Sequence, residues 1–197
     1  SVSAWAQADT ARRVAITIDD LPWASLDGLD EVQLDARHRQ LMAALDTAAV
    51  PVPGFVNGDR LESGGRVLPG RLRVLVDWLE RGHELGNHTH GHVDLHAVGL
   101  ETYEQAILDG ERELRPLLAE AGTAPRWFRH PYPRAGRSVD DRAALQAFLD
   151  AHGYRIAPVT IDNSDWIWAL AYRKAREAAP DPAREDTLAR LRRDYVP

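Results

Sequence analysis

The chain has 197 residues, of which 44% are hydrophobic and 27% charged, as is typical of one soluble globular domain. The formal net charge is -6 without any basic run, so nucleic acid and anionic membrane surfaces are disfavoured as partners. Cysteine is absent, which excludes disulfides and thiolate metal sites and leaves histidine and carboxylate side chains as metal ligands.

The N-terminal segment, residues 1–12, is expected to be a flexible tail. Within it, Ala6-Gln7-Ala8 has the A-x-A pattern of a signal-peptidase site. We interpret the segment as the remnant of an export signal and predict a periplasmic or extracellular protein. The alternatives are a plain alanine-rich terminus and a cytoplasmic location. No apolar run approaches the roughly 20 residues that a membrane-spanning helix needs.

Hydrophobic periodicity predicts strands that alternate with helices. The β-branched run RVAITI indicates the first buried strand, and Leu72, Leu75 and Leu79 have helical spacing. The expected strands are 13–18, 52–56, 84–87, 126–129 and 154–161. The expected helices are 31–49, 71–81, 100–121, 140–152 and 167–197, the last with a break near Pro180–Pro182.

This βαβα order predicts an α/β fold in which a parallel sheet or barrel is covered by helices, as one domain over residues 13–197. Polar residues follow the expected strands. In α/β barrels the C-terminal strand ends gather into one site, so these polar segments are expected to converge. The polar segments are 19–20, 57–59, 88–92, 129–132 and 162–165.

Two adjacent carboxylates, Asp19 and Asp20, end the first expected strand. Neighbouring side chains on a strand point in opposite directions, so one carboxylate can bind a metal while the other faces a substrate water. A strand-ending turn, where aspartate is common, is the alternative explanation.

Three histidines alternate just after another expected strand, at His88, His90 and His92. Imidazole is the commonest metal-binding side chain near neutral pH, and a hydrolytic site needs about three protein ligands and one open position. His88 and His92 are separated like the two histidines of other zinc sites, and His90 lies between them. A solvated histidine-rich loop is the alternative.

Four segments together resemble the motifs of the polysaccharide deacetylases (carbohydrate esterase family 4, the NodB-homology fold). Thr17–Asp20 is similar to the T-F-D-D motif and Gly86–His92 to H-[ST]-x-x-H. Phe128–Tyr132 is similar to R-x-P-Y and Asp162–Trp166 to D-x-x-D-W. The motifs occur in the family's order. The resemblance implies a distorted (β/α) barrel of the NodB-homology type.

The resemblance also implies a metal centre and a base. Asp20, His88 and His92 would hold one divalent metal ion, with Zn²⁺ as the first candidate. His90 would be a loop residue that points elsewhere. Asp19 would be the general base that deprotonates the attacking water.

Five further residues would surround that centre according to the resemblance. Arg129 would orient Asp19, and Asp165 would in turn hold Arg129. The backbone N–H of Tyr132 would bind the oxyanion, while Trp166 and Pro131 would line the pocket for the acetyl methyl group.

The chain departs from the family pattern around the groove and at its end. Leu21-Pro22-Trp23 stands where a glycine commonly follows the Asp pair, and His130 replaces a common proline. No histidine follows Trp168, whereas the family's L-x-L-H motif supplies a histidine general acid. We therefore expect a C-terminally truncated chain that lacks the last motif and the closing strand; replacement of the acid is the alternative.

These features predict a metal-dependent hydrolase that removes N-acetyl groups, or O-acetyl groups as the second choice, from a carbohydrate or cell-wall polysaccharide. One alternative is a small-molecule amide hydrolase of the same superfamily, such as a deformylase or an allantoinase-like enzyme. The other is a catalytically silent carbohydrate-binding protein.

Overall fold

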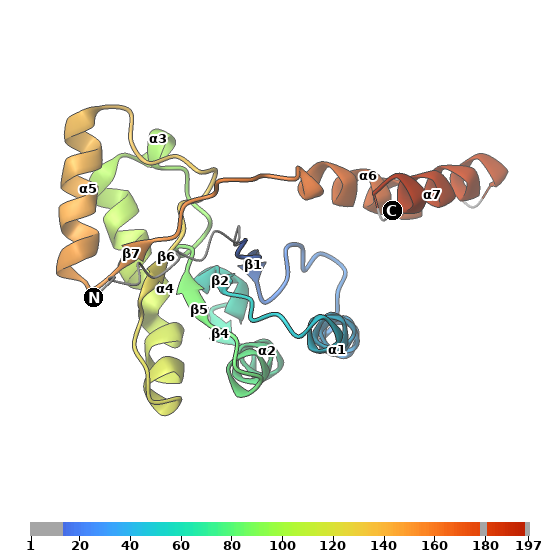
Figure 1. Cartoon of the computed structure of the whole chain (residues 1–197), viewed down its shortest axis with the longest axis horizontal. Coiled ribbons are helices and arrows are strands. Elements are labelled where there is room, and N and C mark those ends of the chain that lie inside the picture. Colours follow the sequence, from blue (N-terminus) through green and yellow to red (C-terminus); the bar gives the residue numbers. More distant parts are fainter. Residues whose placement is uncertain (1–13, 178–180, 196–197) are drawn as a thin grey trace, which may run out of the picture. The chain divides into compact units, whose positions relative to one another are not determined.

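The computed structural model describes residues 14–177 and 181–195 (Figure 1). Arg13, the Ala6–Ala8 pattern and Pro180 lie outside these described residues. The chain divides into two compact units, residues 1–158 and 159–197, and each is described by itself. The expectation of one catalytic domain over residues 13–197 stays a prediction.

The first unit is built on a five-stranded parallel sheet with the order β1-β2-β5-β6-β7 (Figure 1). Because the order in space equals the order in the chain, right-handed crossovers all step in one direction and place their helices on one face, as in an α/β barrel. This confirms the predicted α/β fold with a parallel sheet. The strands are β1 (Ile18–Leu21), β2 (Gly54–Val56), β5 (Leu85–Asn87), β6 (Trp127–Phe128) and β7 (Arg155–Ile156).

Two helices of this unit, α1 and α5, begin at a capping box that the sequence supplies. Asp30 accepts a hydrogen bond from the Gln33 N–H at the start of α1, and Ser138 accepts one from the Asp141 N–H at the start of α5. Both form capping boxes, which satisfy N–H groups that a helix leaves open. The helices are α1 (Glu31–Ala48), α2 (Pro69–Glu80), α3 (Leu95–Val98), α4 (Leu100–Glu120) and α5 (Val139–Ala151).

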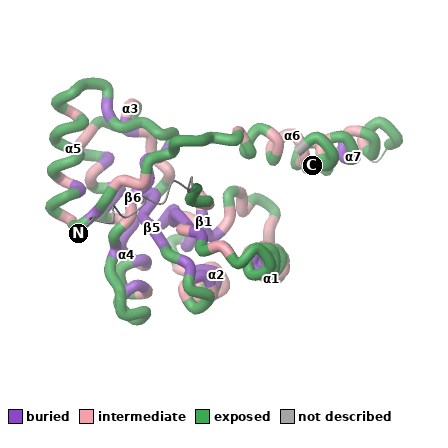
Figure 2. The backbone as a smooth tube through the Cα atoms, in the orientation of Figure 1, coloured by how far each residue is buried: buried purple, intermediate pink, exposed green. Residues whose placement is uncertain are grey.

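Two apolar clusters hold the helices to the sheet, and Figure 2 shows the buried positions concentrated on the strands and on the inward sides of the helices. The Trp78 indole N–H in α2 donates to the carbonyls of Val52 (3.0 Å) and Glu84 (3.1 Å), which fixes α2 against the starts of β2 and β5. The first cluster contains Leu21, Met42, Val52, Val56, Leu61, Leu75, Trp78, Leu85, Leu114 and Leu118. The second contains Leu95, Tyr103, Ile107, Phe128, Leu145, Leu149 and Tyr154.

The first strand is shifted from its expected position. The sequence predicts residues 13–18, whereas β1 begins at Ile18 and includes both aspartates. The ladder with β2 starts at the Ile18–Gly54 pair, and Val14 and Ile16 are 75% and 51% exposed. A β-branched run therefore does not form a strand without a partner. For the same reason the expected strand 154–161 is reduced to the two residues of β7, which pair with β6.

Several short elements were not predicted. A 3-10 turn, η1 (Gly58–Leu61), follows β2 and leads into the hairpin β3 (Glu62–Ser63) and β4 (Arg66–Val67). The single-turn helix α3 follows the histidines. Each is too short to leave a periodic pattern in the sequence.

The second unit is a pair of packed helices, α6 (Asp165–Glu177) and α7 (Pro182–Tyr195). The Arg192 guanidinium donates to the Tyr172 hydroxyl (2.8 Å), and the Arg184 Nε donates to the Ala175 carbonyl (3.0 Å). The expected helical stretch thus begins two residues early, at Asp165. In the described ranges, no helix has the length and apolar character needed to cross a membrane.

Candidate metal centre

The sheet places the candidate ligands at neighbouring strand ends. Asp20 lies in β1, and His88 directly follows β5, which is separated from β1 only by β2. Asp20, Thr89, His92 and Tyr132 all have positive φ, between 48° and 68°. Residues other than glycine rarely adopt this conformation, and such strain concentrates at functional sites.

Asp20, His88 and His92 converge on one point. The Oδ1 atom of Asp20 lies 3.7 Å from His92 Nε2 and 4.0 Å from His88 Nε2. The three ligand atoms all lie within 4.8 Å of one another. Zn²⁺ held tetrahedrally by bonds of about 2.1 Å would bring such atoms to roughly 3.4 Å apart, so the group is slightly wider than a closed site. These three residues could hold one metal ion.

Both imidazoles are prepared to act as neutral ligands. His88 is buried, and its Nδ1 donates to the Arg129 carbonyl at 2.8 Å, which leaves the Nε2 lone pair directed at Asp20. Burial lowers the pKa of His88 to about 4. Burial also lowers the pKa of His92, although the nearby Asp20 carboxylate opposes the shift. A neutral His–His–carboxylate set matches the donors that Zn²⁺ prefers.

A second carboxylate of β1, that of Asp19, is paired with a buried arginine. Asp19 Oδ2 is 3.5 Å from Arg129 Nη1, and Arg129 Nη2 donates to the Thr17 hydroxyl at 3.0 Å. The guanidinium also covers the Phe55 ring, 4.5 Å from its centre. Burial lowers the pKa of Arg129, and the Asp19 charge opposes that shift. Arg129 therefore contacts Asp19 through its guanidinium and His88 through its backbone carbonyl.

Tyr132 lies against the candidate ligand His92, although the residue is 52% exposed. The ring centre is 4.6 Å from that of His92, and the Arg134 guanidinium covers the tyrosine ring at 5.5 Å. Arg134 in turn pairs with Asp94. The preceding Pro131 is buried. The loop after β6 thus forms one wall beside the ligands.

Three further residues considered in the sequence are not members of the group formed by Asp20, His88 and His92. His90 Nε2 is 3.9 Å from Glu62 Oε1 and does not belong to the ligand group. Asp165 and Trp166 open α6 in the second unit, where both are exposed, so they are described only within that unit.

Two residues that the sequence argument did not assign to the site contact Asp20. Asn57 donates to its Oδ1 through Nδ2, and the Arg60 Nη2 lies 3.5 Å from the same oxygen. Segment 57–59 was expected to converge with the other polar segments because it follows a strand, but no role was expected for Asn57 itself.

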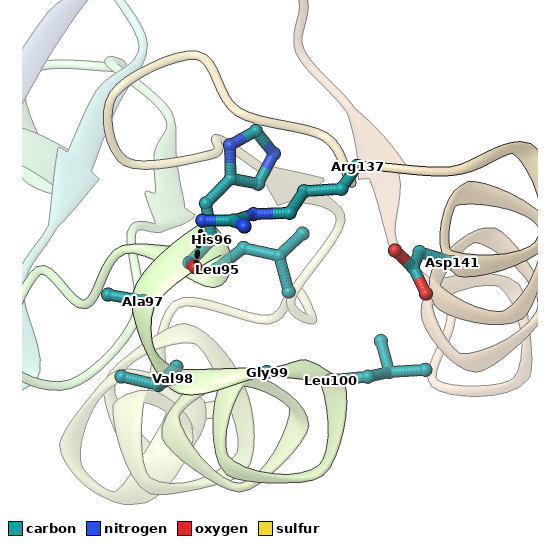
Figure 3. Close-up of a pocket in the computed structure, with 8 residues that line it drawn as sticks. All are labelled: Leu95, His96, Ala97, Val98, Gly99, Leu100, Arg137 and Asp141. Carbon is teal, nitrogen blue, oxygen red and sulfur yellow. Dashed lines mark hydrogen bonds between the residues drawn. The ribbon is translucent and has the colours of Figure 1, made fainter.

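A separate open pocket of about 380 Å³ lies between α3, the start of α4 and α5 (Figure 3). Its polar groups serve the fold: Arg137 donates to the His96 carbonyl (2.8 Å), and Asp141 accepts from the Ser138 N–H (3.2 Å). None of the residues that line this pocket is one of the three candidate ligands Asp20, His88 and His92. The lining residues are Leu95, His96, Ala97, Val98, Gly99, Leu100, Arg137 and Asp141.

The fold is similar to that of several solved structures. The peptidoglycan deacetylase PdaC from Bacillus subtilis is 19% identical, with 91% of this chain and 83% of that chain covered and a TM-score of 0.55. The family 4 carbohydrate esterase from Streptomyces lividans, solved with acetate, is 19% identical over 91% and 84% of the two chains, with a TM-score of 0.54. BA3943, a CE4 family pseudoenzyme from Bacillus anthracis, is 17% identical over 92% and 50%, with a TM-score of 0.55.

At these identities the solved structures establish the fold alone. A comparison with curated protein sequences finds no match. The family described as "Polysaccharide deacetylase" matches residues 6–154, which include Asp20, His88, His92 and Arg129. The match covers more than half of the chain, and the chain therefore belongs to the polysaccharide deacetylase family.

Proposed function

We propose that this chain removes N-acetyl groups from a carbohydrate or cell-wall polysaccharide with the help of one divalent metal ion. The observation that carries the proposal is the convergence of Asp20 Oδ1 with the Nε2 atoms of His88 and His92. The contact between Arg129 and the neighbouring Asp19 adds to it. Membership of the family supports carbohydrate deacetylation. O-acetyl groups are the second choice of substrate.

The metal ion would be held by Asp20, His88 and His92, and Zn²⁺ is the first choice for this donor set. When bound, the ion supplies Lewis-acid chemistry, which polarises the acyl oxygen and makes water more acidic. The lowered pKa values of both histidines support this assignment, because a protonated imidazole cannot bind a metal.

Asp19 would accept a proton from the water that attacks the acyl carbon. The C–N bond then breaks as the leaving nitrogen takes up a proton, which the proton accepted by Asp19 balances, and acetate and the free amine are released. Arg129 would hold Asp19 in the orientation seen here, because the buried guanidinium lies next to the carboxylate. We assign Asp165 to hold Arg129 in the working enzyme.

The remaining assignments concern the acyl group. The backbone N–H of Tyr132 would donate to the oxyanion that develops on the acyl oxygen. Pro131 and Trp166 would line the space for the acetyl methyl group. A cell-wall substrate also agrees with the prediction of export, which rests on residues outside the described part of the chain.

The test is acetate release by the zinc-loaded protein from chito-oligosaccharides and from acetylxylan, with a small cyclic amide such as allantoin in parallel. Asp19→Asn should keep one zinc per chain and lose about 10²–10⁴-fold in kcat, as expected for the loss of a general base.

The possible outcomes separate the rival functions. Turnover of the cyclic amide alone would identify a small-molecule amide hydrolase. Binding of zinc and of the oligosaccharide without any acetate release would identify a silent carbohydrate-binding protein. Full turnover by Asp19→Asn would remove Asp19 as the base.

A further inference from the structure

Asn57 is fully buried at the end of β2, yet its side chain does not serve the turn that follows. It occupies the N-cap position of η1, where asparagine is favoured because its side chain can accept a hydrogen bond from a helical N–H, but it makes no such bond. Its backbone is fixed independently: its N–H donates to the Leu21 carbonyl, and its carbonyl accepts from the Arg60 N–H, both at 3.1 Å. The amide group is therefore available for another role.

The Asn57 amide is directed at Asp20. Its Nδ2 donates to Asp20 Oδ1, the same oxygen that faces the Nε2 atoms of His88 and His92. A carboxylate can only accept, so this contact determines which end of the amide faces Asp20. Among the described residues, Asn57 Oδ1 is buried without a hydrogen-bond partner. Asp20 is thus the group that orients this side chain.

Asn87, at the end of the neighbouring strand β5, shows what a structural asparagine looks like in the same setting. It is equally buried, but its Nδ2 donates to the Ile107 carbonyl and to the Tyr154 hydroxyl, both at 2.8 Å. Its Oδ1 accepts from the Thr89 N–H at 2.7 Å. Asn87 therefore connects elements of the fold through both ends of its amide. Asn57 uses only its Nδ2 end, which binds the candidate metal ligand Asp20.

Arg60 supports the same carboxylate from the other side. Its Nη1 donates to the carbonyls of Ala24 (2.7 Å) and Trp23 (3.1 Å), and its Nη2 lies 3.5 Å from Asp20 Oδ1. These bonds fix the backbone that follows Asp20, whose φ of 68° is an unfavourable conformation for aspartate. A ligand on strained backbone depends on such surrounding contacts to keep its orientation.

We propose that Asn57 is a positioning residue for Asp20, which it holds so that Oδ1 points at His88 and His92, and that Arg60 supports it by fixing the backbone after Asp20. The inference rests on the proposed function, since it takes Asp20 as a metal ligand. Contacts of this kind typically change metal affinity by 10–100-fold.

The test is titration of the metal-free full chain with Zn²⁺ and with Co²⁺. Calorimetry measures the binding of each metal, and the visible spectrum reports the surroundings of bound Co²⁺. Asn57→Leu keeps the volume and removes the donor, and Asn57→Ala removes both. Each variant should bind one metal with a Kd raised about 10–100-fold and an altered Co²⁺ spectrum. The melting temperature of metal-free Asn57→Leu should not fall, because the unpaired buried carbonyl is removed as well.

Arg71→Met is the matched control. Arg71 donates to the carbonyls of Arg60 (3.0 Å) and Glu62 (2.8 Å), so it braces the same segment without acting on Asp20. This variant should melt at a lower temperature and keep the wild-type Kd. If Asn57→Leu does not fold, the Kd of Asn57→Ala for the metal tests the inference.

Two results are decisive against the inference. A wild-type Kd in the folded Asn57 variants would overturn it while leaving the proposed function intact. A wild-type chain that binds neither Zn²⁺ nor Co²⁺ would overturn the proposed function and the inference together.

Discussion

At the scale of single residues, the clearest contrast lies between two histidines of the same loop. His92 faces Asp20, whereas His90 lies near Glu62, outside the ligand group. His92→Ala and Asp20→Ala should therefore abolish stoichiometric Zn²⁺ binding, while His90→Ala should retain one zinc per chain. Metal analysis after dialysis measures the difference. Full zinc content in His92→Ala, or its loss in His90→Ala, would contradict the ligand assignment.

His130 makes the stability of the fold depend on pH. It is 6% exposed, its Nδ1 accepts from the Tyr103 hydroxyl at 3.1 Å, and burial lowers its pKa to about 4. The unfolded chain, with a histidine pKa of about 6.5, binds the proton more readily. The contribution of His130 to stability is thus fully present above pH 6.5 and is lost as the pH falls towards 4, on the order of 3 kcal/mol in all.

His130→Asn keeps an acceptor for Tyr103 and removes the titration. The slope of unfolding free energy against pH between 6.5 and 4, measured by denaturant titration of the metal-free protein, should become shallower. The slope should not vanish, because burial also lowers the pKa of His88, which makes stability depend on pH in the same direction. Tyr103→Phe, which keeps the imidazole, should lower stability and retain the slope. An unchanged slope in His130→Asn would rule out this source of pH dependence.

The three candidate ligands could be named from the sequence because the motifs that contain them resemble those of the polysaccharide deacetylases. Asn57 could not be assigned, because its contact with Asp20 joins residues 37 positions apart and depends on the register of β1 against β2. The positive φ angles of Asp20 and His92 were equally hidden. Aspartate and histidine adopt this conformation more often than most residues, but the sequence does not show at which positions they do so.

At the scale of elements, α4 approaches the histidine loop closely at Gly110. A Cβ there would lie 2.7 Å from Asn87 Oδ1 and 3.0 Å from the Thr89 backbone carbon. Alanine normally stabilises a helix relative to glycine, by about 1 kcal/mol. Here the clash should dominate, so Gly110→Ala should destabilise the fold by about 1–3 kcal/mol.

Gly70→Ala in the first turn of α2 is the control for that substitution. Its Cβ would meet the end of the Glu31 side chain, which can move aside, so stability should stay level or rise. Chemical denaturation measures both variants. Equal stabilisation by the two substitutions would show that α4 does not depend on a glycine at this contact.

The helices were more predictable than the strands. The bounds of α1 and α4 follow from caps and periodicity, which are local, and they agree with the expected ranges within a residue or two. The start of β1 depends on where β2 offers a partner, and β7 is short because β6 is short. Strand limits are set by tertiary pairing, which the local sequence does not contain.

At the scale of the whole molecule, the alternation of strands and helices was sufficient to predict the parallel sheet, since crossover connections leave few other arrangements. The division after Pro158 was not predicted. It depends on the distribution of contacts along the folded chain: both apolar clusters end by Tyr154, whereas α6 and α7 pack on each other.

That division leads to a prediction for residues 1–158 produced alone. The shortened chain contains both clusters and all three candidate ligands, so it should unfold in one cooperative transition and bind Zn²⁺ with the affinity of the full chain. Its deacetylation rate should fall, because the proposed roles of Asp165 and Trp166 are removed. Asp165→Asn in the full chain should reproduce part of that loss without changing zinc affinity. Weakened zinc binding by the shortened chain would instead show that the second unit contributes to the metal centre, and an unchanged rate would remove both residues from the proposed site.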